Sequence, residues 1–99
     1  MRAIERTTRQ FVASLEEAMP GLQIAVERSR NDWGRSHYVH IRDDAQQRYW
    51  KVRISDHAVG MRRALSGRED AYISAGARPA SWAVWIGELK RLVDGPRPQ

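Results

Sequence analysis

Two short runs in which apolar and polar residues alternate, 37–42 and 48–54, constrain the fold more than any other feature. A period of two is typical of β-strands, because successive side chains point to opposite faces of a sheet. The five residues between the runs, 43–47, are a common length for a hairpin loop. The sequence therefore predicts a β-hairpin with two chemically different faces.

One face of this hairpin is apolar and is expected to meet a core. Its residues are Val39, Ile41, Trp50, Val52 and Ile54. The other face is basic and aromatic. Its residues are Tyr38, His40, Arg42, Tyr49, Lys51 and Arg53. Aromatic rings stack on bases while cations neutralise phosphates, so this second face suits single-stranded nucleic acid or an acidic protein patch. The alternative is a solvated face whose cross-strand pairs only stabilise the sheet.

An amphipathic helix is predicted before the hairpin, because apolar residues recur at helical spacing between positions 8 and 19. Thr7 and Gln10 match a capping box that would start the helix at this point. Ile4 continues the apolar stripe and would allow an earlier start. Pro20-Gly21 ends the helix.

A further strand is predicted at Leu22, Ile24 and Val26, which alternate with more polar residues. Turn-forming residues between positions 28 and 35 indicate a loop from this strand to the hairpin. After the hairpin the pattern weakens, and we expect a short helical turn at 61–65 and a short strand at 71–74. The three clear strands would form a meander.

A second amphipathic helix is predicted near the C-terminus, where Ser81 can cap it. Its apolar stripe consists of Trp82, Trp85, Ile86, Leu89, Leu92 and Val93. Asp94-Gly95-Pro96 stops it, and residues 96–99 are expected to be a loose tail. The expected fold class is α+β: a single domain over residues 1–99, with a three- to four-stranded antiparallel sheet and an N-terminal and a C-terminal helix packed on one face.

Composition points to a reducing compartment and an anionic partner. The chain has no cysteine, which excludes disulfides and thiolate chemistry, and no apolar run long enough to span a bilayer. A cytoplasmic protein without membrane contact is expected. The net charge is +5, with fifteen arginines against two lysines, Lys51 and Lys90. Guanidinium groups bind phosphate and carboxylate, although a GC-rich coding sequence would produce the same skew.

Ser55-Asp56-His57 contains the residue types of a hydrolase triad. Triad members are brought together from separated positions, and adjacent residues on a chain point in different directions. We therefore interpret Ser55 and Asp56 as a strand end whose polar side chains hydrogen-bond nearby backbone amides and start the next turn. No enzymatic activity and no catalytic residue are predicted.

Metal and carboxylate sites are not indicated either. His37 and His40 lie three apart on a strand and so on opposite faces, which prevents them from sharing a metal ion. The adjacent acidic pairs, Glu16-Glu17 and Asp43-Asp44, do not resemble carboxylates placed across a substrate and are expected on the solvated surface. No cofactor is predicted.

Three residues outside the hairpin strands are further binding candidates. Trp33 lies among turn-forming residues, where its ring would either anchor an interface or fold back over the sheet edge. Arg62 and Arg63 could add to the basic face as an anion site, or could be two solvated arginines on a helical turn.

The segments Ser36-His37-Tyr38-Val39-His40-Ile41 and Trp50-Lys51-Val52-Arg53-Ile54-Ser55-Asp56-His57 together resemble a pattern in small phage and mobile-element proteins, including small domains associated with large polyvalent proteins. From Ser36 to His57 the pattern spans about a fifth of the chain. By analogy, the resemblance implies an accessory protein that binds a protein target stoichiometrically, as an anti-CRISPR inhibitor covers a Cas effector. A basic module that binds DNA or RNA is the alternative. The oligomeric state stays open, because a free edge strand could pair with a second copy.

Overall fold

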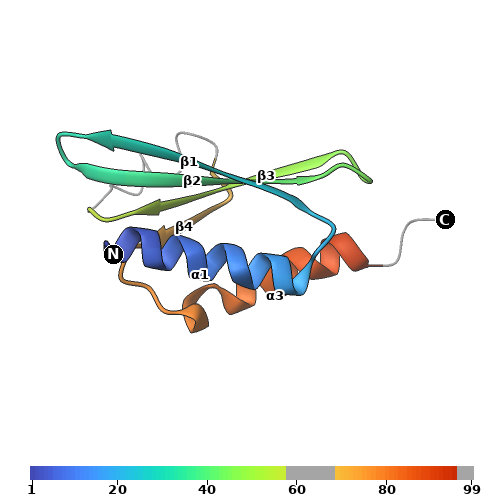
Figure 1. The fold of residues 1–99 in the computed structure, drawn as a ribbon. Helices are drawn as coiled ribbons and strands as arrows, with labels where there is room; N and C mark the ends of the chain where they lie inside the picture. Colours follow the sequence, from blue (N-terminus) through green and yellow to red (C-terminus); the bar gives the residue numbers. More distant parts are fainter. Residues whose placement is uncertain (58–68, 96–99) are drawn as a thin grey trace.

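The computed structural model describes residues 1–57 and 69–95. Its elements in chain order are α1 (Ala3–Ala18), β1 (Gln23–Asn31), β2 (Gly34–Asp43), β3 (Arg48–Ser55), β4 (Ala71–Ser74) and α3 (Pro79–Asp94). The strands form one sheet in the order β1-β2-β3-β4, and both helices lie against the same face of it (Figure 1). The predicted α+β class, with two helices on one face of a mainly antiparallel sheet, is confirmed. Of the helices described, none combines the length and apolarity needed to cross a bilayer.

α1 and α3 run in the same direction, from the side of the β1–β2 turn toward the β2–β3 loop (Figure 1). Both end near the β2–β3 loop, where Gln46 Nε2 donates a hydrogen bond to the carbonyl oxygen of Val93 at 2.9 Å. Lys90 Nζ donates to the carbonyl oxygen of Ala18 at 3.1 Å and so ties the end of α3 to the end of α1. The β1–β2 hairpin extends past the first turn of α1.

Helix α1 begins earlier than the predicted capping box. The N-cap is Arg2, and no side chain caps the helix there. Thr7 is a buried residue of the second turn, and its hydroxyl donates a hydrogen bond to the carbonyl oxygen of Ala75. The capping-box assignment of Thr7 with Gln10 was wrong, because a buried tertiary partner uses the threonine hydroxyl. The early start indicated by Ile4 is confirmed.

The predicted loop at 28–35 is mostly strand. β1 and β2 stay paired up to Asn31 and Gly34, and only Asp32 and Trp33 form the turn. The side chain of Asn31 satisfies this turn, since its Oδ1 accepts hydrogen bonds from the backbone N–H of Trp33 at 2.8 Å and of Gly34 at 3.2 Å. The turn formers that predicted a loop therefore make a two-residue hairpin turn.

Strand β4 lies where it was predicted but pairs parallel to β3, with Val52 opposite Ala71. Parallel neighbours cannot be joined by a two-residue hairpin, and residues 56–70 separate these two strands in the sequence. Asp70 leads into the pairing: its N–H donates to the Lys51 carbonyl at 2.7 Å, and its Oδ2 accepts from the Lys51 N–H at 2.8 Å. The helical turn predicted at 61–65 lies outside the described residues.

The hairpin of β2 and β3 supplies the floor of the core as predicted. Val39, Ile41, Val52 and Ile54 have no exposed surface, and Trp50 is half-buried. The helices cover them with an aromatic contact, in which the rings of Phe11 and Trp82 meet edge to face with centroids 5.8 Å apart. Such a pair contributes about 0.5–1.5 kcal/mol beyond the burial of its area.

Helix α3 starts at Pro79 rather than after a Ser81 cap. Ser81 lies in its first turn and donates its hydroxyl to the carbonyl oxygen of Arg78 at 2.7 Å. Pro79 is suited to the first helical position because it has no N–H to satisfy. The predicted end at Asp94 is confirmed, whereas Leu92, assigned to the apolar stripe, is 54% exposed.

Asp43 departs from its predicted surface position. Asp44, Glu16 and Glu17 are exposed, but Asp43 is buried, and among the described residues its Oδ2 has no hydrogen-bond partner. The reason is the pleat: Asp43 is the last residue of β2 and shares the inner face with Ile41. Adjacency to Asp44 misled the prediction, since the two residues lie on different elements.

Candidate binding surfaces

The six predicted binding residues of the hairpin share the sheet face that the helices leave uncovered. Cross-strand pairing places Tyr38 opposite Arg53, His40 opposite Lys51, and Arg42 opposite Tyr49. We call this surface the outer face. The alternation of the sequence predicted its membership without error, because the register of β2 with β3 contains no bulge.

Cation–aromatic contacts organise one half of the outer face. Lys51 Nζ lies 4.8 Å from the ring centroid of Tyr38, and the Arg53 guanidinium carbon lies 5.6 Å from the same ring. All three side chains are only half-buried. These contacts stabilise the sheet, as the solvated-face alternative requires, and they also fix the positions of two cations.

Histidine and tyrosine rings organise the other half. The His40 and Tyr49 rings stack with centroids 5.9 Å apart and an interplanar angle of 26°. His40 Nε2 lies 2.9 Å from Glu27 Oε1 on β1. Burial raises the pKa of the Tyr49 phenol, and the negative charges of Asp70 and Glu27 raise it further, so the phenol stays neutral at physiological pH.

A groove of about 400 Å³ crosses the outer face beside these rings. It is lined by Gln23, Ile24, Ala25, His40, Arg42 and Tyr49. We call it the outer groove. Ala25 lies opposite His40 in the pairing of β1 with β2, and its short side chain leaves room beside the stacked rings. The volume lies within the range of small-molecule sites, roughly 300–1,000 Å³.

The Ser-Asp-His segment joins the end of β3 to the start of β2. Ser55 Oγ and Ser36 Oγ are 2.8 Å apart, and Arg53 donates to both of them, at 3.0 Å from Nε and 3.1 Å from Nη2. Both serines are buried. The two halves of the sequence pattern, Ser-x-Tyr and Lys-Val-Arg-Ile-Ser-Asp-His, therefore contact each other directly.

Asp56 continues this contact along the backbone. Its Oδ1 accepts from the Arg35 N–H at 2.8 Å, and its own N–H donates to the Arg35 carbonyl at 3.2 Å. Burial alone would raise the pKa of Asp56, but the hydrogen bond from Arg35 and the contact with His57 outweigh it and lower that pKa. The predicted role of Asp56, a polar strand end that binds a backbone amide, is confirmed.

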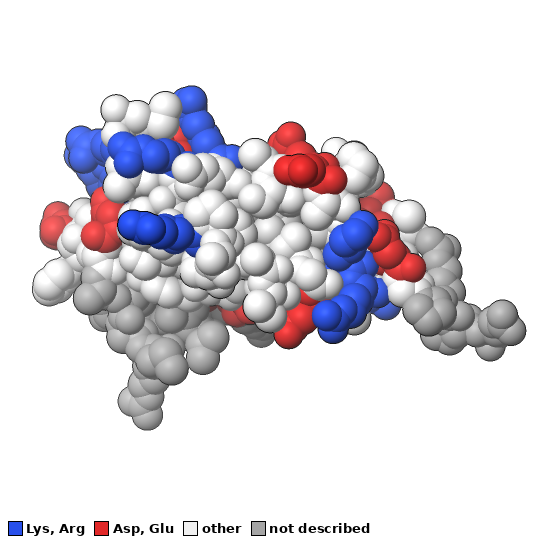
Figure 2. Space-filling view, turned by 90° about the horizontal axis from the view of Figure 1, so that it is seen from below, with Lys and Arg blue, Asp and Glu red and all other residues white. Residues whose placement is uncertain are grey.

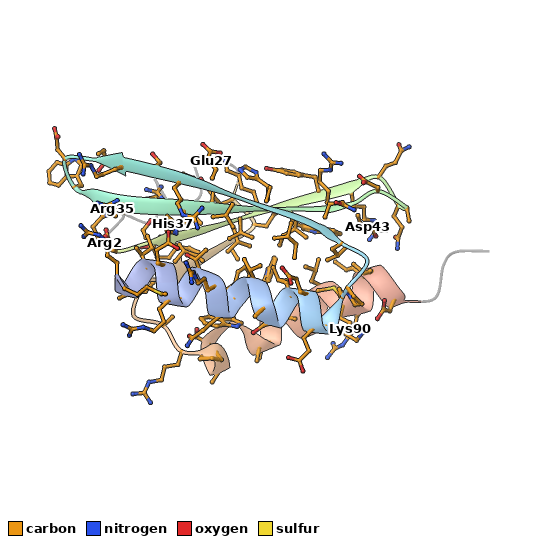
Figure 3. All side chains as sticks on the ribbon, in the orientation of Figure 1. Arg2, Glu27, Arg35, His37, Asp43 and Lys90 are labelled. Carbon is orange, nitrogen blue, oxygen red and sulfur yellow. The ribbon has the colours of Figure 1, made fainter. Side chains whose placement is uncertain are left out.

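Sequence reasoning missed a second basic surface at the far end of the sheet. A cavity of about 140 Å³ lies between the start of α1 and the β1–β2 hairpin. It is lined by Arg2, Ile4, Glu5, Arg28, Ser29, Arg30, Arg35 and His37. We call it the arginine cavity. Figure 3 shows Arg2, Arg35 and His37 together at this end of the molecule.

The predicted loop at 28–35 concealed this surface. With β1 and β2 extended to the turn, Arg28 pairs with His37 and Arg30 with Arg35, and all four lie on the inner face. Continuing the alternation of Ile24 and Val26 by two more steps would have found them. Seen from the helix side, the middle of the molecule carries few charges, and lysine and arginine side chains gather at its two ends (Figure 2).

The remaining predicted site residues do not join these surfaces. Trp33 is 76% exposed at the tip of the β1–β2 turn, so its ring does not fold back over the sheet edge. Arg62 and Arg63 lie outside the described residues. No family model matches the chain, and neither a curated protein nor a solved structure matches it at a significant level.

Proposed function

We propose that this chain is a nucleic-acid-binding protein that uses the outer face of its sheet to hold a single strand. The outer groove supports the proposal most directly, because it brings the His40–Tyr49 stack and the Arg42 guanidinium to one hollow. Bases stack on aromatic rings, and cations neutralise the phosphates between them. A purely solvated sheet face does not require such a hollow.

Exposure divides the roles of these side chains. Tyr49 is 52% exposed, so one base can extend its stack with His40. The Arg42 side chain is 60% exposed, and its ion pair with Asp44 at 3.2 Å can exchange for a phosphate contact at little cost, since exposed pairs contribute only about 0–1 kcal/mol. Lys51 and Arg53, fixed over Tyr38, extend the positive surface along the strands.

Fluorescence anisotropy with a labelled oligonucleotide of about 15 nucleotides tests the proposal. We expect binding at about 50 mM salt that weakens steeply as salt is added, because each neutralised phosphate releases a counterion. Replacement of Tyr49 by Ala should weaken binding about 5- to 100-fold, which corresponds to the loss of one base stack. Arg42→Ala should weaken binding and also reduce the salt dependence.

Arg91→Ala is the matched control, because Arg91 is an exposed arginine of α3 in the helix layer. It changes the net charge of the protein as Arg42→Ala does. Equal weakening by both variants would show a general charge effect and refute the assignment to the outer face. Failure of the wild-type chain to bind any oligonucleotide at low salt would refute the function itself.

The second candidate is stoichiometric binding of a protein, and the exposure of Trp33 favours it. Tryptophan is enriched among residues that dominate protein interfaces, and here it lies exposed at the tip of the β1–β2 hairpin. Inhibition of a Cas effector, the role implied by the resemblance to phage and mobile-element proteins, is the narrower form of this candidate.

Co-purification with purified Cas effector complexes tests the narrower form. We expect a stable complex with the wild-type chain and a loss of about 30-fold or more in affinity with Trp33→Ala, in line with an interface anchor worth at least 2 kcal/mol. Tyr49→Ala serves as the comparison on the outer face. No stable complex and no inhibition would refute this candidate.

A further inference from the structure

The arginine cavity has an excess of positive charge that the described structure does not neutralise. Of its four arginines, Arg28 is bound to Glu5, with Nη2 donating to Oε2 at 3.2 Å. Within residues 1–57 and 69–95, no carboxylate forms an ion pair within 4.0 Å of the guanidinium groups of Arg2, Arg30 and Arg35, although Asp56 accepts from the backbone N–H of Arg35. Four arginines thus line the cavity together with one acidic residue, Glu5.

Strand pairing determines on which face of the sheet three of these arginines lie. Arg28 and Arg30 occupy inner-face positions of β1, and Arg35 does so on β2. Arg35 is also half-buried, with its backbone held on both sides by Asp56. Arg2, Arg28 and Arg30 are solvent-exposed, and the presence of four arginines around one small cavity favours an anionic occupant.

His37 closes the cavity from the core side and has one ring nitrogen to spare. Its side chain is 3% exposed, and Nδ1 lies 2.9 Å from Thr8 Oγ1. Since the Thr8 hydroxyl donates its proton to the carbonyl oxygen of Ile4, Nδ1 is the donor in this contact. Burial lowers the pKa of His37, so Nε2 is the unprotonated acceptor nitrogen of a neutral ring, and Glu5 Oε1 lies 3.7 Å from it, beyond hydrogen-bond length.

The first turn of α1 adds to the same field. Its N-cap, Arg2, supplies no side-chain cap, so the N–H groups of the first turn are not satisfied by the residue that precedes them. Free N–H groups and the helix dipole both favour negative charge at this end. The arginines and the helix start therefore favour negative charge in one volume, whereas His37 forms its wall without adding charge.

We propose that the arginine cavity binds a phosphate group. Its volume of about 140 Å³ equals the space of roughly four to five water molecules at about 30 Å³ each, which admits a tetrahedral oxyanion. Arginine makes paired hydrogen bonds to phosphate oxygens, and several arginines converge here. The phosphate is either the free ion or the terminal group of a larger molecule. The site is separate from the outer groove, so this proposal does not depend on nucleic-acid binding there.

Titration of the ¹⁵N-labelled protein with inorganic phosphate, followed by NMR, tests the proposal. Sodium chloride keeps the ionic strength constant, and acetate is titrated in parallel. We expect saturable shifts of the amides at the start of α1 and around the β1–β2 turn with phosphate. Arg35→Gln and Arg30→Gln should each weaken phosphate binding at least about fivefold, as expected for the loss of one charge-assisted hydrogen bond.

Arg78→Gln is the matched control, because Arg78 is likewise an N-cap arginine without a side-chain cap, at the start of α3. It should leave phosphate binding unchanged. Arg30 is exposed, so Arg30→Gln keeps the test valid if Arg35→Gln does not fold. A linear response without saturation, equal shifts with acetate, or equal weakening by Arg78→Gln would overturn the proposal.

A second titration identifies the source of the phosphate. Two short oligonucleotides that differ only in a 5′-phosphate or a 5′-hydroxyl are compared in the Tyr49→Ala variant, in which the outer groove is weakened. Preference for the phosphorylated molecule, abolished by Arg30→Gln, supports capture of a nucleic-acid end. Binding of inorganic phosphate without such a preference supports a free-ion site.

Discussion

Gly34 is the position at which a single methyl group should do the most damage to the hairpin. It begins β2 with a backbone φ of +147°, a conformation that side chains other than glycine rarely adopt. A Cβ added there would lie 2.4 Å from Asp56 Oδ1 and 2.7 Å from His57 Nδ1. Gly34→Ala must therefore strain the backbone and also displace the Asp56 carboxylate.

The expected cost follows from these two effects. Holding a non-glycine residue in this region costs about 1–3 kcal/mol. Restoring ordinary contact with the new methyl group moves Asp56 Oδ1 by about 1 Å, which stretches its 2.8 Å hydrogen bond from the Arg35 N–H beyond bonding range. Because Asp56 is solvent-exposed, we assign this bond about 1 kcal/mol. The free energy of unfolding should fall by about 3 kcal/mol, and Tm by roughly 10–25 °C.

Urea denaturation followed by circular dichroism measures this loss. Gly21→Ala is the control, because a Cβ at Gly21 meets nothing within 4 Å. In an Asp56→Ala background the displaced carboxylate is absent, so Gly34→Ala should cost less there, by at least about 0.5 kcal/mol. A loss below about 0.5 kcal/mol in the wild-type background would refute the packing of the Ser-Asp-His segment described above, as would strictly additive costs in the double variant.

Three further measurements address stability. Thr8→Val should lower the free energy of unfolding by about 1–3 kcal/mol, because it leaves Nδ1 of buried His37 without an acceptor, whereas Thr8→Ser should retain most of it. Burial lowers the pKa of His37, so as pH falls below 6.5 the unfolded chain takes up a proton before the folded one does. The free energy of unfolding measured in urea should therefore be lower at about pH 5.5 than at about pH 7.5. A His40→Gln control should keep this difference. Gly87→Ala in α3 should raise stability by about 1 kcal/mol, since the added Cβ meets nothing within 4 Å; a lower Tm would contradict this.

The spacing of apolar residues was sufficient to predict the strands and the helix that bury one face against the core. The strands around Val39 and Val52 and the helix around Trp82 were predicted correctly, because burial on one face imposes a period of two or about 3.6. The outer face followed from the same periodicity. For these segments, no information from distant residues was required.

Prediction failed where a distant residue decides the outcome. Thr7 resembles a helix cap but donates its hydroxyl to the carbonyl oxygen of Ala75, and the local sequence of β4 does not reveal that it pairs in parallel with β3. His37 was judged only as a metal ligand, although its partner Thr8 lies 29 positions earlier in the chain. Such contacts depend on tertiary packing, which propensity and spacing do not encode.

The predicted loop at 28–35 hid the arginine cavity for a different reason. Asn31, Asp32 and Gly34 are turn formers in a run of charged residues, and this composition is typical of a loop. In the structure the β1–β2 hairpin extends beyond the start of α1. The inner face of the hairpin therefore has no apolar layer to pack against at this end. Arginine can occupy those positions without burying its charge, and the strand continues where the apolar pattern stops.

The pleat of β1 then separates two surfaces that are adjacent in sequence. Glu27 lies on the outer face and contacts His40 beside the outer groove, whereas the next residue, Arg28, lies on the inner face and reaches Glu5 at the arginine cavity. A slip of one residue in the β1–β2 register would exchange these faces, moving Arg28 to the outer side and Glu27 toward the helix start. The two-residue turn at Asp32 and Trp33, fixed by the Asn31 side chain, is what holds that register. Both proposed binding surfaces therefore depend on the geometry of one short hairpin turn.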